Sequence, residues 1–218
     1  LSASSLAQEL KTQALANAQR SGSEGDALAA LEAASFPERK TERWKYTSLQ
    51  ALADGHLNAI ADGEISQPLP ALSEHVVTIN NGQLVSHNLP DGVTLSHDGP
   101  AINGLQTPFA FYNSAVASQP VVLTVAANTR IEPPIHVQIQ SASDAPAHCN
   151  PRLVVVLNQG AEAAVIEHYH AEGQALTNAV TALVTADNAQ LTHYRLQGEQ
   201  ASSLHIGTLI IDQQGISK

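Results

Sequence analysis

The chain has 218 residues, enough for one large domain or two small ones that each bury a core. Its formal net charge of −10 argues against a surface that binds nucleic acid or an anionic membrane. No apolar run approaches the roughly 20 residues of a membrane-spanning helix. The single cysteine, Cys149, excludes an intrachain disulfide and favours a reducing compartment, so we expect a cytoplasmic protein.

Residues 1–60 are predicted to form a small helical region. Leucine and alanine recur at helical spacing over residues 6–18, and a loop at residues 21–25 separates this helix from a second one at residues 26–34. A further short helix is expected over residues 49–57. These stretches are rich in alanine and weakly amphipathic, which predicts an appendage with no chemistry of its own.

A run of basic and aromatic residues at 36–49 is the most distinctive local sequence. It contains the only tryptophan, Trp44, followed closely by Tyr46. One interpretation is a docking patch for an anion or an acidic partner. The other is that Trp44 is a packing residue that fixes the helical region to the rest of the chain, with the basic side chains in solvent around it.

Residues 61–120 are predicted to be a linker and hairpin region that leads into the core. Two alternating runs at residues 75–79 and 83–86 flank the turn Asn80-Asn-Gly82, which is typical of a β-hairpin. Prolines and glycines predict irregular structure over residues 87–108.

Residues 121–218 are predicted to be a repeated β unit. Apolar runs that end in a small polar turn recur at residues 121–128, 153–160, 180–188 and 207–215. If Asn128, Asn158, Asp187 and Asp212 are equivalent turn positions, the steps are 158 − 128 = 30, 187 − 158 = 29 and 212 − 187 = 25. Three of the turns are followed by a second strand-like run, at residues 134–139, 163–169 and 191–196. This near-constant step favours a solenoid of stacked coils, although strands joined by frequent turns also describe an antiparallel sandwich.

Several of these segments resemble a known family. The order Phe-Pro-x-Arg-Lys-x-Glu-x-Trp-Lys-Tyr-Thr-x-Leu over residues 36–49 is similar to the N-terminal signature of the SufD branch of the SufB/SufD family of iron–sulfur cluster assembly scaffold proteins. Residues 109–115, Pro151-Arg152, residues 167–169 and His193-Tyr194 are also similar to this family. The resemblance runs from about residue 36 to the end of the chain.

The resemblance implies a fold and a function. The fold is a mainly β, right-handed parallel β-helix over residues 121–218, preceded by a small N-terminal helical region. The implied function is a non-catalytic scaffold subunit that acts with a SufB-like partner and a SufC-like ATPase. The chain itself would bind no cofactor, because the iron–sulfur cluster is the product of the complex.

Members of this family are longer than this chain. The resemblance therefore implies that the residues linked to cluster assembly and the helices that grip the ATPase lie beyond Lys218. We expect the last predicted coil, with its apolar run at residues 209–211, to associate with a second copy through the β-helix.

The histidines suggest an alternative. His168 and His170 lie two apart in a predicted strand, so they share a face, and His193 follows on the next repeat. A His-x-His pair on a strand is typical of a cupin-like metal-dependent enzyme. Glu172 lies too close to His170 for the carboxylate expected there, and no later segment completes the ligand set. We therefore expect no firmly bound zinc or iron.

Cys149 is the remaining candidate for reactive chemistry. It lies in a predicted loop beside His148, and a thiolate next to an imidazole can be nucleophilic. Neighbours in a loop rarely share the geometry of a catalytic pair, and the sequence has no phosphate-binding loop and no nucleophile elbow. We assign no catalytic, cofactor-binding or metal-binding residue, and we expect the chain not to be an enzyme.

Overall fold

A computed structural model describes residues 3–23, 25–38, 41–57, 59–117 and 119–218. Its helices are α1 (Ala3–Arg20), α2 (Gly25–Ala33) and α3 (Pro108–Val116), with short 3-10 turns at Glu42–Trp44 and Gln50–Asp54. No helix within these ranges is long and apolar enough to cross a bilayer. The basic pair at residues 39–40, part of the distinctive segment, lies outside the described residues.

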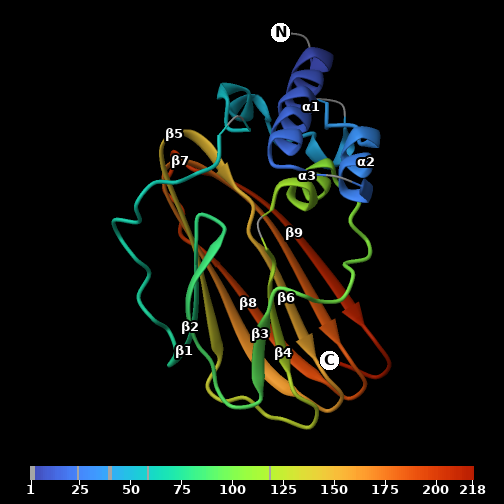
Figure 1. The fold of residues 1–218 in the computed structure, drawn as a ribbon, viewed down its shortest axis with the longest axis vertical. Helices are drawn as coiled ribbons and strands as arrows, with labels where there is room; N and C mark the ends of the chain where they lie inside the picture. The colour runs from blue at the N-terminus through green and yellow to red at the C-terminus, as the bar shows by residue number, and fades with distance from the viewer. Residues whose placement is uncertain (1–2, 24, 39–40, 58, 118) are drawn as a thin grey trace.

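The strands form two walls that share a core (Figure 1). They are β1 (His75–Asn80), β2 (Gln83–Asn88), β3 (Val93–Ser96), β4 (Val121–Val125), β5 (Ile135–Cys149), β6 (Arg152–Leu157), β7 (Glu162–Thr185), β8 (Gln190–Gln197) and β9 (Leu204–Gln213). The long strands β5 and β7 bend, so each contributes to both walls. The first half of β7 pairs with β5 and β8, and its second half pairs with β6 and β9.

Parallel pairing between successive coils confirms the β-solenoid and rules out the antiparallel sandwich. β4 pairs with β6, β6 with β7, and β7 with β9, which makes about three turns. Arg152 pairs with Val180 and Leu176 with Leu204, so the later coils repeat with a step of 28 residues (180 − 152 and 204 − 176). The predicted fourth turn position at Asp212 is wrong by three residues, because Asp212 lies in β9 and Gly215 is the residue that stacks on Asp187.

Strands β1, β2 and β3 cover the first coil. β1 and β2 form the predicted hairpin, with Asn81 and Gly82 at positive φ in the turn, and β1 then pairs in parallel with β5. β3 pairs antiparallel with β4 on the other wall. Residues 87–108 were expected to be irregular, and β3 corrects that expectation, because its short apolar run gains its partner only from the fold.

The core between the walls is almost entirely aliphatic, and aromatic residues make up only 4% of the chain. Inward positions on both walls carry valine, isoleucine and leucine, among them Val77, Leu123, Ile135, Val155 and Val165, each with at most 1% of its surface exposed. Small branched side chains suit this arrangement because a parallel coil stacks like on like, and a narrow coil has little room for large rings.

The helical region packs against one end of the solenoid. Leu10, Leu31 and Phe36 are buried with Phe109 of α3 and Leu176 of β7. Trp44 is half-buried on the same cluster, with its ring 5.4 Å from that of Phe109, so the packing interpretation of this residue is confirmed. Tyr46, in contrast, is 92% exposed.

Buried hydrogen bonds join the same two parts. The ring of His148 lies between Tyr112 of α3 and Asn17 of α1, with its Nε2 atom 2.8 Å from the Tyr112 hydroxyl and 2.7 Å from Asn17 Nδ2. All three side chains are at least 95% buried. Because unpaired buried polar groups are costly, this set of contacts specifies how the helices dock.

The bend within β7 requires glycine at one position. Gly173 has a φ of +68°, and a Cβ atom there would overlap the carbonyl oxygen of Ser143 in the coil below. Gly22 has a similar φ of +74° but no atom within 4 Å of the same position. We expect Gly173→Ala to lower the free energy of unfolding by about 3 kcal/mol and Gly22→Ala by only about 1 kcal/mol, since only the first adds a collision to the left-handed strain.

Urea unfolding of the two variants, monitored by circular dichroism, measures this difference. Equal losses of stability in both variants would show that the coils do not approach each other closely at Gly173.

Candidate functional site

The inside of the solenoid becomes charged in its later coils. Strand β7 points Glu167 inward between the walls, and β8 points His193 and Arg195 toward it. In the parallel register Glu167 stacks between Val137 of β5 and Arg195 of β8. An ionic group therefore occupies a position that is aliphatic one coil earlier.

The carboxylate of Glu167 is fully satisfied. Its Oε2 atom accepts hydrogen bonds from His193 Nε2 at 2.9 Å and from Nε and Nη2 of Arg195 at 3.1 and 3.0 Å. Its Oε1 atom accepts from the hydroxyls of Tyr169 and Thr181. The side chain of Glu167 has no exposed surface. We call these five residues the Glu167 cluster.

The cluster holds charge and does not transfer protons readily. Burial alone would raise the pKa of the Glu167 carboxyl, but the His193 hydrogen bond, the charge of Arg195 and the two hydroxyls together lower the pKa to about 2. Burial and the neighbouring carboxylate raise the pKa of Tyr169 well above its ordinary value. A general acid or base works best with a pKa near the working pH, so this geometry fits a structural ion pair.

A second polar arrangement lies on the outer face of the β5–β7 wall. Side chains of β5 and of the middle of β7 bind the backbone of residues 66–72, which we call the strap. The Leu72 amide donates to His136 Nδ1 at 3.2 Å, Gln138 Nε2 donates to the Leu69 carbonyl at 2.9 Å, and the Leu69 amide donates to Gln140 Oε1 at 2.7 Å. The carboxylate of Glu172 accepts from the amides of Ser66 and Gln67.

His168 and His170 share this outer face, as their spacing predicted, but they bind different groups. Because His136 Nδ1 accepts from Leu72, the proton of this neutral ring lies on Nε2, which contacts His168 Nδ1 at 3.3 Å. His170 Nδ1 donates to the Gly198 carbonyl at 3.0 Å. His193 points inward, away from both, in the Glu167 cluster. Among the described residues no three His, Cys, Asp or Glu side chains are grouped so that they could hold a metal ion.

Cys149 and His148 are neighbours in sequence but do not pair. Cys149 is buried at the end of β5 with its Sγ atom 3.8 Å from the Thr177 hydroxyl, and burial raises the pKa of the thiol to about 11. The His148 ring points instead to Tyr112 and Asn17, and burial lowers its pKa to about 4. The loop expected for these residues is strand, and the thiol is neither exposed nor activated.

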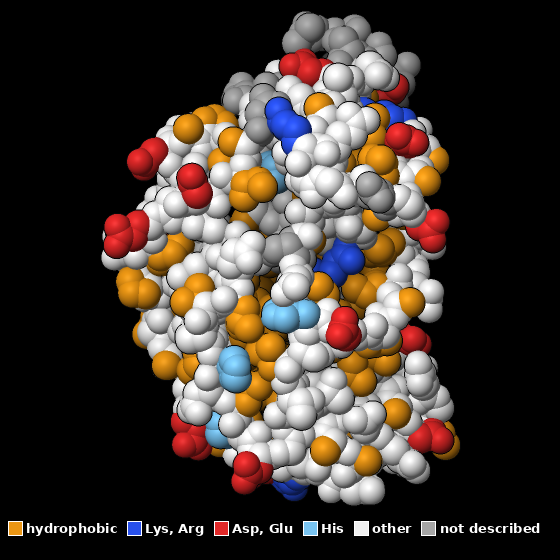
Figure 2. Space-filling model, in the orientation of Figure 1, with side chains coloured by type: hydrophobic (Ala, Val, Ile, Leu, Met, Phe, Trp, Pro, Cys, Tyr) orange, Lys and Arg blue, Asp and Glu red, His pale blue; other side chains and the backbone are white. Residues whose placement is uncertain are grey.

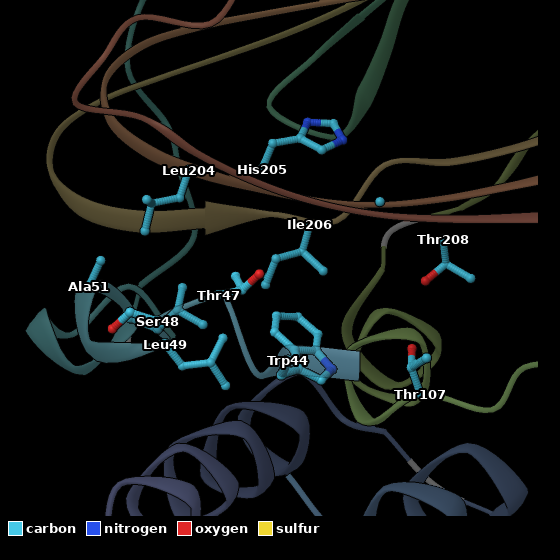
Figure 3. A pocket seen from close by; sticks show the side chains of 12 residues that line it. Trp44, Thr47, Ser48, Leu49, Ala51, Thr107, Leu204, His205, Ile206 and Thr208 are labelled. Carbon is cyan, nitrogen blue, oxygen red and sulfur yellow. The ribbon is translucent and has the colours of Figure 1, made fainter. Parts of the chain in front are cut away.

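An apolar cavity of about 290 Å³ separates the helical region from β9. Figure 3 shows the Trp44 ring below Ile206, with Leu204 and His205 further along the strand and Leu49 on the helical side. The indole thus contributes one wall of the cavity, which explains why Trp44 is only half-buried.

Two comparisons with known proteins agree with the geometry. The model of the SUF system FeS cluster assembly SufBD core domain matches residues 138–218, the coils that contain the Glu167 cluster. An iron–sulfur cluster assembly SufBD family protein of Synechocystis is 26% identical over 217 residues. Together they support the SufB/SufD family for this chain. They do not favour a cupin-like enzyme built on His168 and His170.

The match to the Synechocystis protein covers 82% of this chain and 47% of that relative. The chain therefore spans about half the length of the curated SufB/SufD relative it matches.

The Glu167 cluster should be the most sensitive polar element of residues 138–218, the segment that matches the SufBD core domain. Glu167→Gln leaves the Arg195 guanidinium without its buried counter-charge, so we expect a loss of about 3–5 kcal/mol in the free energy of unfolding. Glu162→Gln is the matched control on the same strand, because Glu162 is 44% exposed and lies 3.8 Å from Arg130. The control should change stability by less than about 0.5 kcal/mol.

Urea unfolding of both variants at pH 7 tests this expectation. A loss in Glu167→Gln no larger than in Glu162→Gln would mean that the carboxylate is not buried among cationic groups.

The strap should respond to acid. Burial, with His168 adding to the effect, lowers the pKa of His136 to about 4, below the ordinary value of 6.5. Between pH 6.5 and pH 4, His136 therefore binds a proton in the unfolded chain but stays neutral in the folded chain. The stability present above pH 6.5 is lost as the pH falls toward 4. His148 has the same direction of shift. We expect the His136→Gln variant to lose about 2 kcal/mol of this pH dependence and to keep the part due to His148.

Unfolding midpoints in urea at pH 7 and pH 4.5 measure the effect, with His87→Gln, an exposed histidine of β2, as the control. An unchanged pH dependence in His136→Gln would contradict the assignment of a neutral ring that accepts from the strap.

Proposed function

We propose that this chain is part of a non-catalytic scaffold subunit of the SUF-type machinery, and that it is of the SufD type. The observation that supports this most is the coincidence of the SufBD core match, residues 138–218, with the coils of the solenoid that contain the Glu167 cluster. The segment similar to a cluster-assembly core is thus also the part in which parallel coils are stacked and joined by a buried ion pair.

The physical properties of these coils suit a scaffold. The Glu167 carboxylate and the Cys149 thiol are both buried, and their pKa values lie far from neutrality. The His136–His168 pair supports the strap. Each of these side chains is thus engaged in contacts within the fold. An assembly scaffold needs such fixed contacts in order to present defined surfaces to its partners.

Two strand edges offer a way to bind a partner. Within the described residues, β8 and β9 each form a ladder with β7 alone. The Leu191 amide at the start of β8 donates to the Lys218 carbonyl at 2.8 Å, and the rest of the outer edge of each strand pairs with no other strand. Leu209 and Ile211 of β9 point toward the core and are 42% and 58% exposed. Addition of strands, from a further coil or from another solenoid, would pair these edges and bury these side chains.

The partners we propose are a SufB-like subunit and a SufC-like ATPase, and a second copy of this chain could use the same edges. The iron–sulfur cluster is then the product of the assembled complex, and this chain holds no cofactor of its own. The cytoplasm is the compartment that fits its single, reduced cysteine.

Co-expression of the full-length protein that contains this chain, tagged, with a SufB-like and a SufC-like subunit tests the proposal. A stable complex should elute as one species. The complex should also form with the His168→Ala/His170→Ala variant, because the proposal gives these side chains no role in partner binding.

A different outcome would support the cupin-like alternative. The protein would purify alone with stoichiometric iron or zinc that survives dialysis, and the double histidine variant would lose that metal while a His87→Ala control kept it. That result would overturn the scaffold assignment.

A further inference from the structure

The outer face of the second wall contains a cavity that the proposed scaffold function does not use. Residues 97–102 cross in front of β4 and β6 and enclose about 320 Å³ against them. Val122 and Val154 form its floor, and Ile102 and Pro120 line its sides. Figure 2 shows this face, where hydrophobic side chains surround a basic one over the strands labelled β4 and β6 in Figure 1.

Arg152, the first residue of β6, is the cation in this cavity. Its Nε atom donates to Asn113 Oδ1 at 3.0 Å and its Nη2 atom donates to Ser114 Oγ at 2.5 Å, both on α3. These acceptors are neutral. Across the described ranges, no carboxylate lies within 4.0 Å of the guanidinium, and no hydrogen bond to another side chain or carbonyl occupies its Nη1 atom.

The contrast with Arg195 shows what is missing. Both arginines are largely buried on the solenoid, but Arg195 has the Glu167 carboxylate as its counter-charge. Burial lowers the pKa of Arg152, which means that its charge is poorly solvated, yet a guanidinium remains charged at any ordinary pH. The α3 contacts hold the group in place and leave one side of it facing the cavity.

The remaining lining limits the kind of anion that fits. Ile102 and Pro120 are only partly buried and offer an apolar surface to a hydrocarbon tail, while Val122 and Val154 beneath them are at most 2% exposed. The carboxylate of Asp98 at the rim would repel a second negative charge. The rim itself is fixed, because Ser96 Oγ donates to the Asp98 carbonyl at 2.6 Å and His97 Nδ1 donates to the Pro120 carbonyl at 2.8 Å. The cavity is thus shaped before any ligand arrives.

We propose that this cavity binds a small monoanionic carboxylate with an apolar tail, its carboxylate on the free side of Arg152 and its tail against Ile102 and Pro120. A planar carboxylate matches two parallel N–H groups of a guanidinium. This site is independent of the scaffold function, since it involves neither the strand edges nor the Glu167 cluster.

Titration of the isotope-labelled protein with sodium hexanoate at pH 7, followed by NMR, tests the site. Saturable shifts are expected for the methyl groups of Ile102 and for the Arg152 Nε–H group. Hexylamine, which has the same tail and the opposite charge, should shift none of them, and inorganic phosphate should bind more weakly than hexanoate. Equal shifts with hexylamine, or shifts that do not saturate, would overturn the proposal.

Variants of the two charges decide the role of Arg152. Arg152→Gln keeps polar atoms for Asn113 and Ser114 and should weaken hexanoate binding by more than roughly tenfold. Asp98→Asn removes the rim charge from an exposed residue and should strengthen binding by roughly twofold to fivefold. Asp91→Asn, an exposed acid outside the cavity, is the matched control.

If Arg152→Gln does not fold, the comparison of Asp98→Asn with Asp91→Asn still decides whether an anion binds in the cavity. Stronger binding in Asp98→Asn alone supports an anion held in the cavity, and identical affinities in the two variants contradict it.

Discussion

The parallel, in-register stacking of successive coils is the constraint on which the rest of this structure depends. β7 pairs on both walls with the coil below and the coil above, so its residues 162–169 and 176–185 each lie beside the residue 28 positions further along. A residue at one position must therefore be compatible with those directly below and above it. The aliphatic columns of the core, the glycine at the β7 bend and the scarcity of aromatic residues follow from that requirement.

The same stacking explains the polar groups. On the inside, the column that contains Val137 continues with Glu167 and then Arg195, so opposite charges lie in adjacent coils and neutralise each other. On the outside, pairing of β5 with β7 brings His136 beside His168 and aligns the side chains that bind the strap. The groups that could carry chemistry are therefore used to hold coils and strap together, which agrees with the scaffold role proposed for a SufB/SufD-type chain.

Much of the fold could be predicted from the sequence, because its signals are local. The repeated apolar runs became β4 to β9, and the Asn80-Asn-Gly82 turn became the β1–β2 hairpin. α3 was overlooked although Thr107 caps it and Pro108 occupies its first turn, a pattern that marks helix starts. β3 had no such signal, since its stability comes from pairing with β4.

The candidate site could not be predicted because it depends on the exact repeat length. The turns suggested a step of 29 residues between the second and third coils, which would place Leu196 beside Glu167. The structure has a step of 28, which places Arg195 there. A slip of one residue moves every side chain to the opposite face of a strand, so an error of this size conceals an internal ion pair.

We propose that the chain contributes to iron–sulfur cluster assembly through its folded surfaces and not through chemistry of its own side chains. The most direct test uses a variant of the full-length protein in which Gln, Gln and Ser replace His168, His170 and Cys149. The activity of an iron–sulfur enzyme is measured in cells that depend on this protein for cluster assembly. Our proposal predicts unchanged enzyme activity per amount of folded protein, even if loss of the His136–His168 contact lowers the protein level. A loss of that activity while the protein level is maintained would contradict it.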